Sequence, residues 1–269
     1  MRLLGVLGRV EALKAVKRPA FWVTVGVFAA FTTIANFAPG GGSERAGFPD
    51  AWRGIIEPAI NLGPVFLAAL MILLFAPEFR WRTARQNVID GLSKEQFYWA
   101  KVLLLAGLAA LFFVTSLVIG TLPFVLDPGG GGGAFIEPMD LNYMLGFVVA
   151  LLLWGTAGLM ISALVRAAGA GLGLLFLYFI CEQIVTALLS SRWSALERFF
   201  DYLPGQLFQT ITDSTLYYPE VLARTNAARA ERGQDLLVYP ELWILLVAAA
   251  GYVVLFLGLA HVNMRRRDL

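Results

Sequence analysis

Six stretches of this sequence are long, apolar and nearly free of charge, and they limit the fold more than any other feature. A helix rises 1.5 Å per residue, so about 20 apolar residues cross the roughly 30 Å hydrocarbon core of a bilayer. The expected spans are residues 20–38, 59–75, 97–126, 144–165, 168–189 and 242–263. Because the chain is 58% hydrophobic and only 15% charged, it is too apolar for a typical soluble domain. The sequence therefore predicts an all-α integral membrane protein in which residues 1–269 form a single transmembrane domain.

The positive charges predict how these spans are oriented. Six spans place both termini on the same side, and with an inner N-terminus 14 of the 21 Lys and Arg residues fall in inner segments. The acidic residues show the opposite bias, and cytoplasmic loops are typically rich in Lys and Arg. The first apolar stretch is also long for a cleaved signal peptide. We therefore expect a multi-pass protein of the plasma (inner) membrane with both the N- and C-termini cytoplasmic.

Residues 1–19 precede the first span and carry apolar residues at helical spacing. Leu3, Leu7 and Val10 belong to this stripe, while Arg9 and Lys14 lie elsewhere on the surface. This pattern is typical of an amphipathic helix that lies along the inner membrane face. An ordinary basic lead-in to the first span is the alternative.

The outer segment, residues 190–241, is long and predicts two helices. Ser194 and Glu197 fit a capping box for a first helix, which Pro204-Gly205 should end. A second helix should begin at Pro219 and stop before Gly233. The segment either gates a pathway or forms a packed outer lid.

The inner segment, residues 78–96, is compact and dense in charge. It contains two capping boxes with a glycine between them: Thr83 with Gln86, Ser93 with Gln96, and Gly91. These signals predict a short helix at about residues 84–90, a turn at 91–92 and a new helix from Lys94. Two helical turns are not stable alone in water. The short helix must therefore dock, either in a cleft of a cytosolic partner or on lipid headgroups or the protein's own inner face.

Several motifs together resemble a known class of membrane protein. "RWRTARQNVIDG" follows the second span, "LSKEQFYWAK" leads into the third, and "YFICEQIV", "YLPGQLF" and "MRRRDL" follow later. With the basic helix before the first span, this order resembles permease subunits of ABC transporters of the type-2 exporter class. The similarity covers nearly the whole chain as an architecture, and the inner segment is its most specific part.

The resemblance implies a permease that pairs with a second permease subunit, identical or related, and with two cytosolic ABC ATPase subunits. The segment that contacts the ATPase maps onto Glu78, Arg82, Thr83, Arg85, Gln86, Asn87, Val88, Ile89, Asp90, Gly91 and Leu92. Because the sequence has no Walker motif, we expect a transport subunit that is not itself an enzyme and binds no cofactor. ATP and Mg would be bound in the partner ATPase.

Glu182 stands in the middle of the fifth span, where a charge costs at least a few kcal/mol unless it is paired or hydrated. It is either a cavity or gate residue, or it makes a structural hydrogen bond between helices. The pathway or gate candidates are Glu182, Leu203 and Pro204. With one cysteine and one histidine, the chain predicts neither a catalytic set nor a Cys/His metal cluster.

Two other classes of function remain as alternatives. A secondary transporter usually has internal repeats and broken helices around midplane charges, and no repeat is evident between the first and last three spans. A polytopic membrane enzyme needs a nucleophile with its base or a set of ligands. In every case we expect membrane lipids, and no nucleic acid, among the partners.

Overall fold

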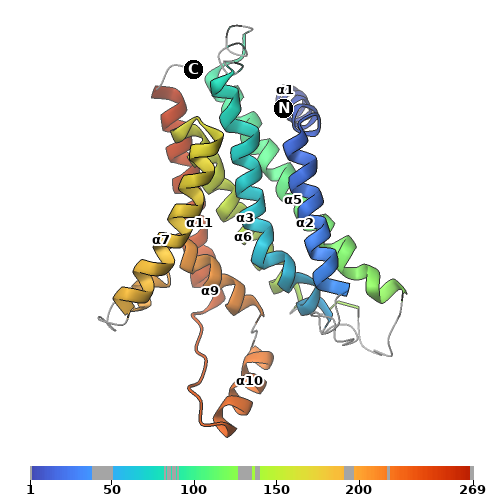
Figure 1. The fold of residues 1–269 in the computed structure, drawn as a ribbon, viewed down its shortest axis with the longest axis vertical. Coiled ribbons are helices and arrows are strands. Elements are labelled where there is room, and N and C mark those ends of the chain that lie inside the picture. Colours follow the sequence, from blue (N-terminus) through green and yellow to red (C-terminus); the bar gives the residue numbers. More distant parts are fainter. Residues whose placement is uncertain are drawn as a thin grey trace.

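The computed structural model of the chain is a bundle of helices (Figure 1). It describes residues 2–37, 51–81, 83, 86, 89, 91–126, 135–136, 140–190, 197–216 and 219–266. Within these ranges the regular structure is helical and contains no strands. The prediction of an all-α protein is confirmed for this part of the chain.

Six of the helices are long and apolar enough to cross a membrane. They are α2 (Pro19–Phe37), α3 (Ala51–Arg80), α5 (Lys94–Leu126), α6 (Asp140–Val165), α7 (Ala168–Ser190) and α11 (Leu242–Arg266). Within the described residues these six candidate spans agree with the predicted stretches in number and order. Helix α3 extends well past both ends of the predicted stretch 59–75, because Pro58, Pro64 and Pro77 lie within it without ending it.

The centre of the bundle is the pair α3 and α6. In their most apolar windows 67% and 61% of residues are buried, against 17% in α7 and 11% in α11. Their backbones cross closely, since a Cβ atom on Gly158 would come within 2.5 Å of the Ala68 carbonyl oxygen. Only a glycine permits this approach. The two peripheral helices α7 and α11 consequently present most of their apolar surface outward.

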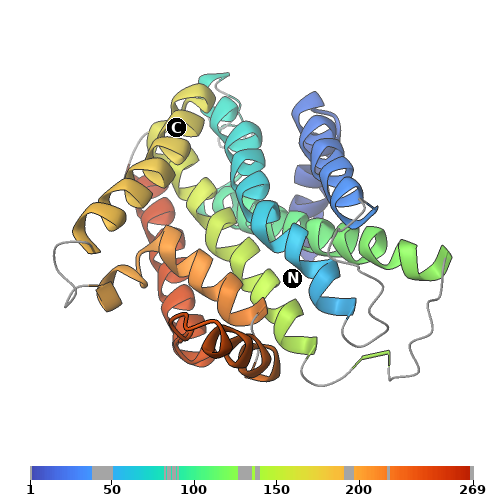
Figure 2. The same cartoon turned by 60° about the horizontal axis from the view of Figure 1, so that its bottom comes forward.

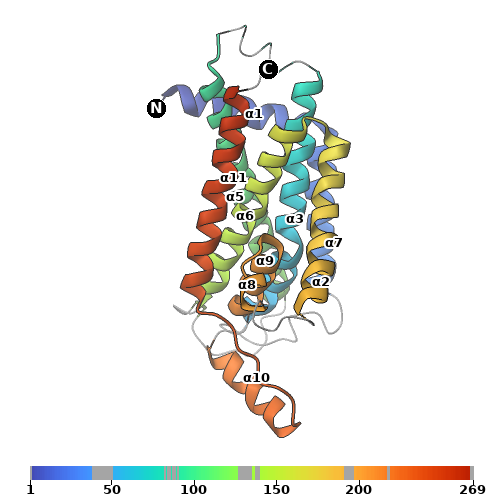
Figure 3. The same cartoon turned by 90° about the vertical axis from the view of Figure 1, so that its left-hand side faces the viewer.

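Helix α1 (Arg2–Val16) lies across one end of the bundle, at a large angle to the spans (Figure 3). The end of α11 lies at the same end, as six spans require. Val6, Val10 and Leu13 of α1 are exposed apolar residues. This arrangement is compatible with the membrane-surface helix expected for residues 1–19, and that location stays a prediction.

At the opposite end the described residues between α7 and α11 form three helices: α8 (Glu197–Phe200), α9 (Pro204–Leu216) and α10 (Pro219–Glu231). The sequence predicts one helix that ends at Pro204-Gly205. In the structure α8 already stops at Phe200, and Pro204 begins a further helix, α9. Proline suits the first turn of a helix, where its missing N–H is not needed. Figure 2 shows α9 packed among the spans, and α10 projects from the body. The burial of Leu207 and Ile211 confirms that α9 belongs to the core.

Candidate functional site

A buried ion cluster joins α1, α3 and α5 at the end of the bundle where α1 lies. Lys101 of α5 is its centre, with only 1% of its side chain exposed. Its ammonium nitrogen is 2.7 Å from Oε2 of Glu78 in α3 and also contacts Oε2 of Glu11 in α1. Lys101 therefore holds two buried carboxylates from two different helices.

Two further cations complete this cluster. Nη2 of Arg18 is 3.4 Å from Oε1 of Glu78, and the same guanidinium donates to the Leu74 carbonyl. Nζ of Lys14 is 2.8 Å from Oε1 of Glu11. Each carboxylate thus has its two oxygens on different cations, which is how buried charges are usually made tolerable.

Aromatic rings line the cations of this ion cluster. Nζ of Lys101 lies 4.9 Å from the ring centroid of Phe97 and 5.4 Å from that of Phe75. The Arg18 guanidinium lies 5.4 Å from the Trp81 ring. The negative faces of such rings attract cations, and the attraction grows where water is excluded.

The Glu11 carboxyl shows how adjacent cations offset the effect of burial on a carboxyl pKa. Burial by itself would raise the pKa of this carboxyl, but the adjacent Lys101 and Lys14 outweigh burial, so the pKa lies below its ordinary value. Glu11 is therefore ionised at neutral pH and serves as the anchor that holds α1 onto α5.

The connection between α3 and α5 starts beside this ion cluster. The Thr83 hydroxyl donates to the main-chain carbonyl of Glu78 at 3.2 Å. Thr83, Gln86 and Ile89 have helical backbone conformation and are exposed, and 67% of Ile89 is accessible. Leu92 packs against the core. Glu78 thus belongs to the ion cluster through its side chain and to the connection through its main chain.

The second half of the connection matches the sequence pattern closely. Gly91 has φ of 104°, a conformation that only glycine adopts readily. The Ser93 N–H donates to Gln96 Oε1 at 3.0 Å, and the Gln96 N–H donates to Ser93 Oγ at 3.1 Å. This reciprocal pair is the predicted capping box, and α5 begins at Lys94 as expected. Of the other proposed ATPase-contacting residues, Arg82, Arg85, Asn87, Val88 and Asp90 lie outside the described residues.

The start of α5 is also fastened to the end of α11. Arg265 pairs with Glu95, and Lys94 Nζ donates to the Arg265 carbonyl at 3.3 Å. One helical turn further, the Tyr98 hydroxyl donates to the Leu257 carbonyl at 3.0 Å. The end of the bundle that holds the connection is therefore tied together from α1 to α11.

Glu182 of α7 has a quite different environment. Its side chain is buried, and its two carboxylate oxygens accept hydrogen bonds from the N–H groups of Gly205 and Gln206 at 3.0 and 2.7 Å. These groups belong to the first turn of α9, where unpaired N–H groups and the helix dipole favour a negative charge. The charge within the fifth span is thus compensated by backbone, which is the structural alternative considered for it.

Around this contact the side chains form a polar cluster inside the bundle. The Gln206 amide donates to Gln183 Oε1 and to Thr186 Oγ1, both at 3.1 Å. Pro204 lies at the start of α9 and lines an apolar pocket, and Leu203 lies one residue before it. A pathway or gate role for Glu182, Leu203 and Pro204 stays a prediction.

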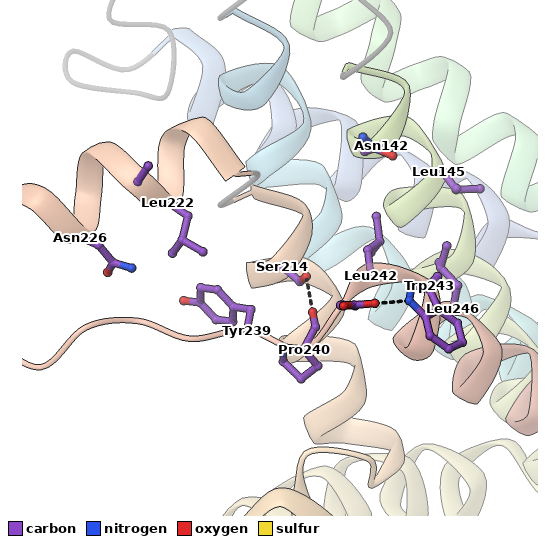
Figure 4. Close-up of a pocket in the computed structure, with 12 residues that line it drawn as sticks. Asn142, Leu145, Ser214, Leu222, Asn226, Tyr239, Pro240, Leu242, Trp243 and Leu246 are labelled. Carbon is purple, nitrogen blue, oxygen red and sulfur yellow. Dashed lines mark hydrogen bonds between the residues drawn. The ribbon is translucent and has the colours of Figure 1, made fainter.

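A larger pocket lies at the end of the bundle where α10 projects (Figure 4). Its volume is about 680 Å³, and it is lined by the start of α6, the end of α9, α10 and the start of α11. Asn226 holds its outer wall together by donating to the Leu237 carbonyl at 2.9 Å and accepting the Leu237 N–H at 2.8 Å. The Ser214 hydroxyl donates to the Pro240 carbonyl at 3.4 Å on the body side. This pocket is open and mixed in polarity.

Among the described residues, no group of three or more His, Cys, Asp or Glu side chains could hold a metal ion. Comparison with known proteins adds no family to these observations. No protein-family model matches the chain, and no curated protein matches it.

Proposed function

We propose that this chain is the membrane-spanning permease subunit of an ATP-driven ABC transporter of the type-2 exporter class. It would work in the plasma (inner) membrane, with cytoplasmic termini, as one of two permease subunits that form the translocation pathway. Separate cytosolic ATPase subunits would bind ATP and Mg. The support is the sequence resemblance together with six candidate spans and the described residues between α3 and α5, of which Thr83, Gln86 and Ile89 are helical and exposed.

The observation that carries the proposal is the position of the ion cluster beneath this connection. Glu78 touches the connection through its carbonyl, and through Lys101 it is linked to α1 and α5. A partner that pushes on the connection would move these three helices together, because their contacts are short, buried and ionic. Such a rigid junction suits a mechanical link between an ATPase and the spans.

The experiment uses Ile89, whose exposed side chain is available to a partner. Tagged chain is purified in mild detergent from membranes of its native host, and copurifying ATP-binding cassette subunits are quantified by mass spectrometry. We expect Ile89→Asp to remove most of the ATPase, because a carboxylate cannot enter an apolar groove without a large desolvation penalty. ATP-dependent transport should fall with it.

Val238→Asp is the matched control. Val238 is 87% exposed and lies in the segment between α10 and α11, at the other end of the bundle. This variant should retain the ATPase of the unmodified chain. Equal amounts of ATPase with Ile89→Asp and Val238→Asp, or no ATPase with the unmodified chain even after chemical crosslinking, would refute the proposal.

A further inference from the structure

Cations and exposed tryptophans gather where the turn between α1 and α2 meets the end of α3, at one end of the bundle (Figure 1). Lys17 lies in this turn, and the Trp22 indole N–H donates to the Val16 carbonyl beside it at 2.8 Å. The Arg18 guanidinium lies 5.4 Å from the ring of Trp81, which follows α3. The two tryptophans are 60% and 62% exposed. The corner patch is defined as Lys17, Arg18, Trp22, Arg80 and Trp81.

The corner patch carries positive charge that the described residues leave uncompensated. Residues 2–37 include one acidic residue, Glu11, and the end of α3 supplies one more, Glu78. Both carboxylates are buried in the ion cluster and are paired there. Lys17 and Arg80 are exposed, and among the described residues neither has an acidic partner. The corner patch therefore attracts an anion from outside the chain.

Arg18 adds a cation that is already held in position. A guanidinium has five N–H donors, and Arg18 uses two contacts to bind the Leu74 carbonyl and Glu78. Its side chain is 21% exposed. Its remaining donors can bind phosphate oxygens, for which the planar guanidinium is well suited.

An apolar track on α2 leads away from the corner patch. Val23, Val27 and Phe31 are spaced four residues apart, so they share one face of the helix, and they are 63%, 50% and 45% exposed. From the first to the last the track is about 12 Å long at 1.5 Å per residue. Tryptophan is typical of the headgroup level of a membrane. An anionic headgroup with a hydrocarbon tail complements both the corner patch and the track, whereas a soluble anion complements only the corner patch.

We propose that the corner patch binds the phosphate headgroup of an anionic phospholipid, with one acyl chain along the apolar track of α2. Lys17 and Arg80 supply charge, Arg18 donates to the phosphate, and the two indole rings lie where the headgroup meets the chains. Because Arg18 also pairs with Glu78, the bound headgroup strengthens the junction of α1, α2 and α3. The inference requires that the chain spans a membrane and is independent of an ATPase or of transport.

The test uses the purified full chain in phosphatidylcholine nanodiscs. They contain a minor fraction of phosphatidylglycerol or phosphatidylcholine that carries a diazirine in one acyl chain, and labelled peptides are quantified by mass spectrometry after illumination. We expect phosphatidylglycerol to label residues 19–31 about 25-fold more than phosphatidylcholine does, because two exposed cations each contribute about fivefold. The two lipids should label α7 alike. Equal labelling of residues 19–31 by the two lipids would overturn the proposal.

Lys17→Gln and Arg80→Gln test the charge of the corner patch. Each variant should lower the phosphatidylglycerol label on residues 19–31 about fivefold. Arg266→Gln is the matched control, because Arg266 is an exposed cation at the same end of the bundle but lies in the last turn of α11. It should leave this label unchanged. An equal loss of label in Arg266→Gln and Lys17→Gln would mean that the general surface potential attracts the lipid, and it would overturn the site.

Inorganic phosphate distinguishes a lipid site from a site for a free anion. An excess of phosphate, compared with chloride at equal ionic strength, should leave the phosphatidylglycerol label on residues 19–31 unchanged, because free phosphate makes no contact with the apolar track. Loss of the label with phosphate but not with chloride would show that the corner patch selects a free anion, and it would overturn the assignment to a lipid.

Discussion

The two buried carboxylate sites of this bundle stabilise negative charge in different ways. In the ion cluster, Glu11 and Glu78 are neutralised by the side chains of Lys101, Arg18 and Lys14. At the other site, the negative charge of Glu182 is stabilised by hydrogen bonds from the backbone N–H groups of Gly205 and Gln206. The first arrangement depends on several side chains from distant parts of the sequence. The second depends on one charged side chain and on a glycine, because a Cβ atom on Gly205 would lie 2.7 Å from Oε2 of Glu182.

This difference suggests different mechanical roles. The ion cluster joins three helices from distant parts of the sequence, so it is suited to transmit movement among them. The contact at Glu182 fixes the start of one short helix, α9, to one span, α7. Helix α9 also packs against α6 and α11, so this contact stabilises the position of a core helix.

The largest expected effect is at Lys101. Among the described residues Lys101 is the one cation that contacts both Glu11 and Glu78, so Lys101→Met should lower the free energy of unfolding by about 3–5 kcal/mol. The measurement is thermal or denaturant unfolding of the purified chain in detergent. The triple variant Glu11→Gln, Glu78→Gln, Lys101→Met should recover much of this loss, because it leaves no fully buried charge unpaired, and the partly exposed Arg18 keeps its contact with the Leu74 carbonyl. A single variant as stable as the unmodified chain would contradict the account of the ion cluster.

The next effect is at Glu182. Glu182→Ala leaves two N–H groups of α9 without their acceptor and should cost about 1–3 kcal/mol. Glu182→Gln keeps one acceptor oxygen and should cost less. The same unfolding measurements apply, together with hydrogen exchange of the α9 amides. If Glu182→Ala were as damaging as Lys101→Met, the contrast between the two sites would be wrong.

Long apolar stretches were sufficient to predict the spans, and a capping box with a preceding glycine was sufficient to predict the start of α5. Apolar length fixes a span because the bilayer thickness is constant. The Ser93 and Gln96 box and Gly91 are local signals whose partners lie within a few residues, and they form as predicted. The proposed partners, by contrast, depend on surfaces that no local signal describes.

The ion cluster and α9 were harder to anticipate because their partners are distant in sequence. Lys101 lies inside the predicted span 97–126, and a lysine there signals a buried anion, but not which one. Glu11 and Glu78 are 90 and 23 residues away. Helix α9 was missed because Pro204-Gly205 is also a common helix stop, and its N–H groups are satisfied by Glu182 from another helix. Both features are tertiary contacts that override local propensity.

A smaller effect is expected at Ser93, which caps α5 at an exposed position. Ser93→Ala should cost about 1 kcal/mol, because water can replace the lost acceptor for the Gln96 N–H. Ser93→Asn retains a capping oxygen and should be nearly neutral. The unfolding midpoints of Ser93→Ala and Ser93→Asn are measured and compared with the midpoint of Glu182→Ala. If Ser93→Ala lowered the free energy of unfolding more than Glu182→Ala, burial would not determine how strongly a side chain stabilises a helix N-terminus in this bundle.

The smallest effect, and the only gain, is expected at Asp213 of α9. Burial and the charge of Glu57 raise the pKa of this carboxyl above its ordinary value. A raised pKa means that the folded chain favours the protonated form, so stability is lost as pH rises through that pKa. Asp213→Asn removes this loss, so the variant should be more stable than the unmodified chain at pH 8. The gain in the free energy of unfolding should be smaller than the loss expected for Ser93→Ala.

The pH dependence separates Asp213 from the ion cluster, because the two carboxyls shift in opposite directions. The pKa of Glu11 is lowered, so Glu11 stays ionised above the ordinary value of about 4.3, and its contribution is lost only on strong acidification. A changing difference between Asp213→Asn and the unmodified chain therefore reports Asp213. We expect the advantage of the variant to shrink as the pH falls from 8 toward the ordinary aspartate value of about 3.9. A constant advantage over that whole range would mean that the gain comes from packing or hydrogen bonding and not from the charge of Asp213.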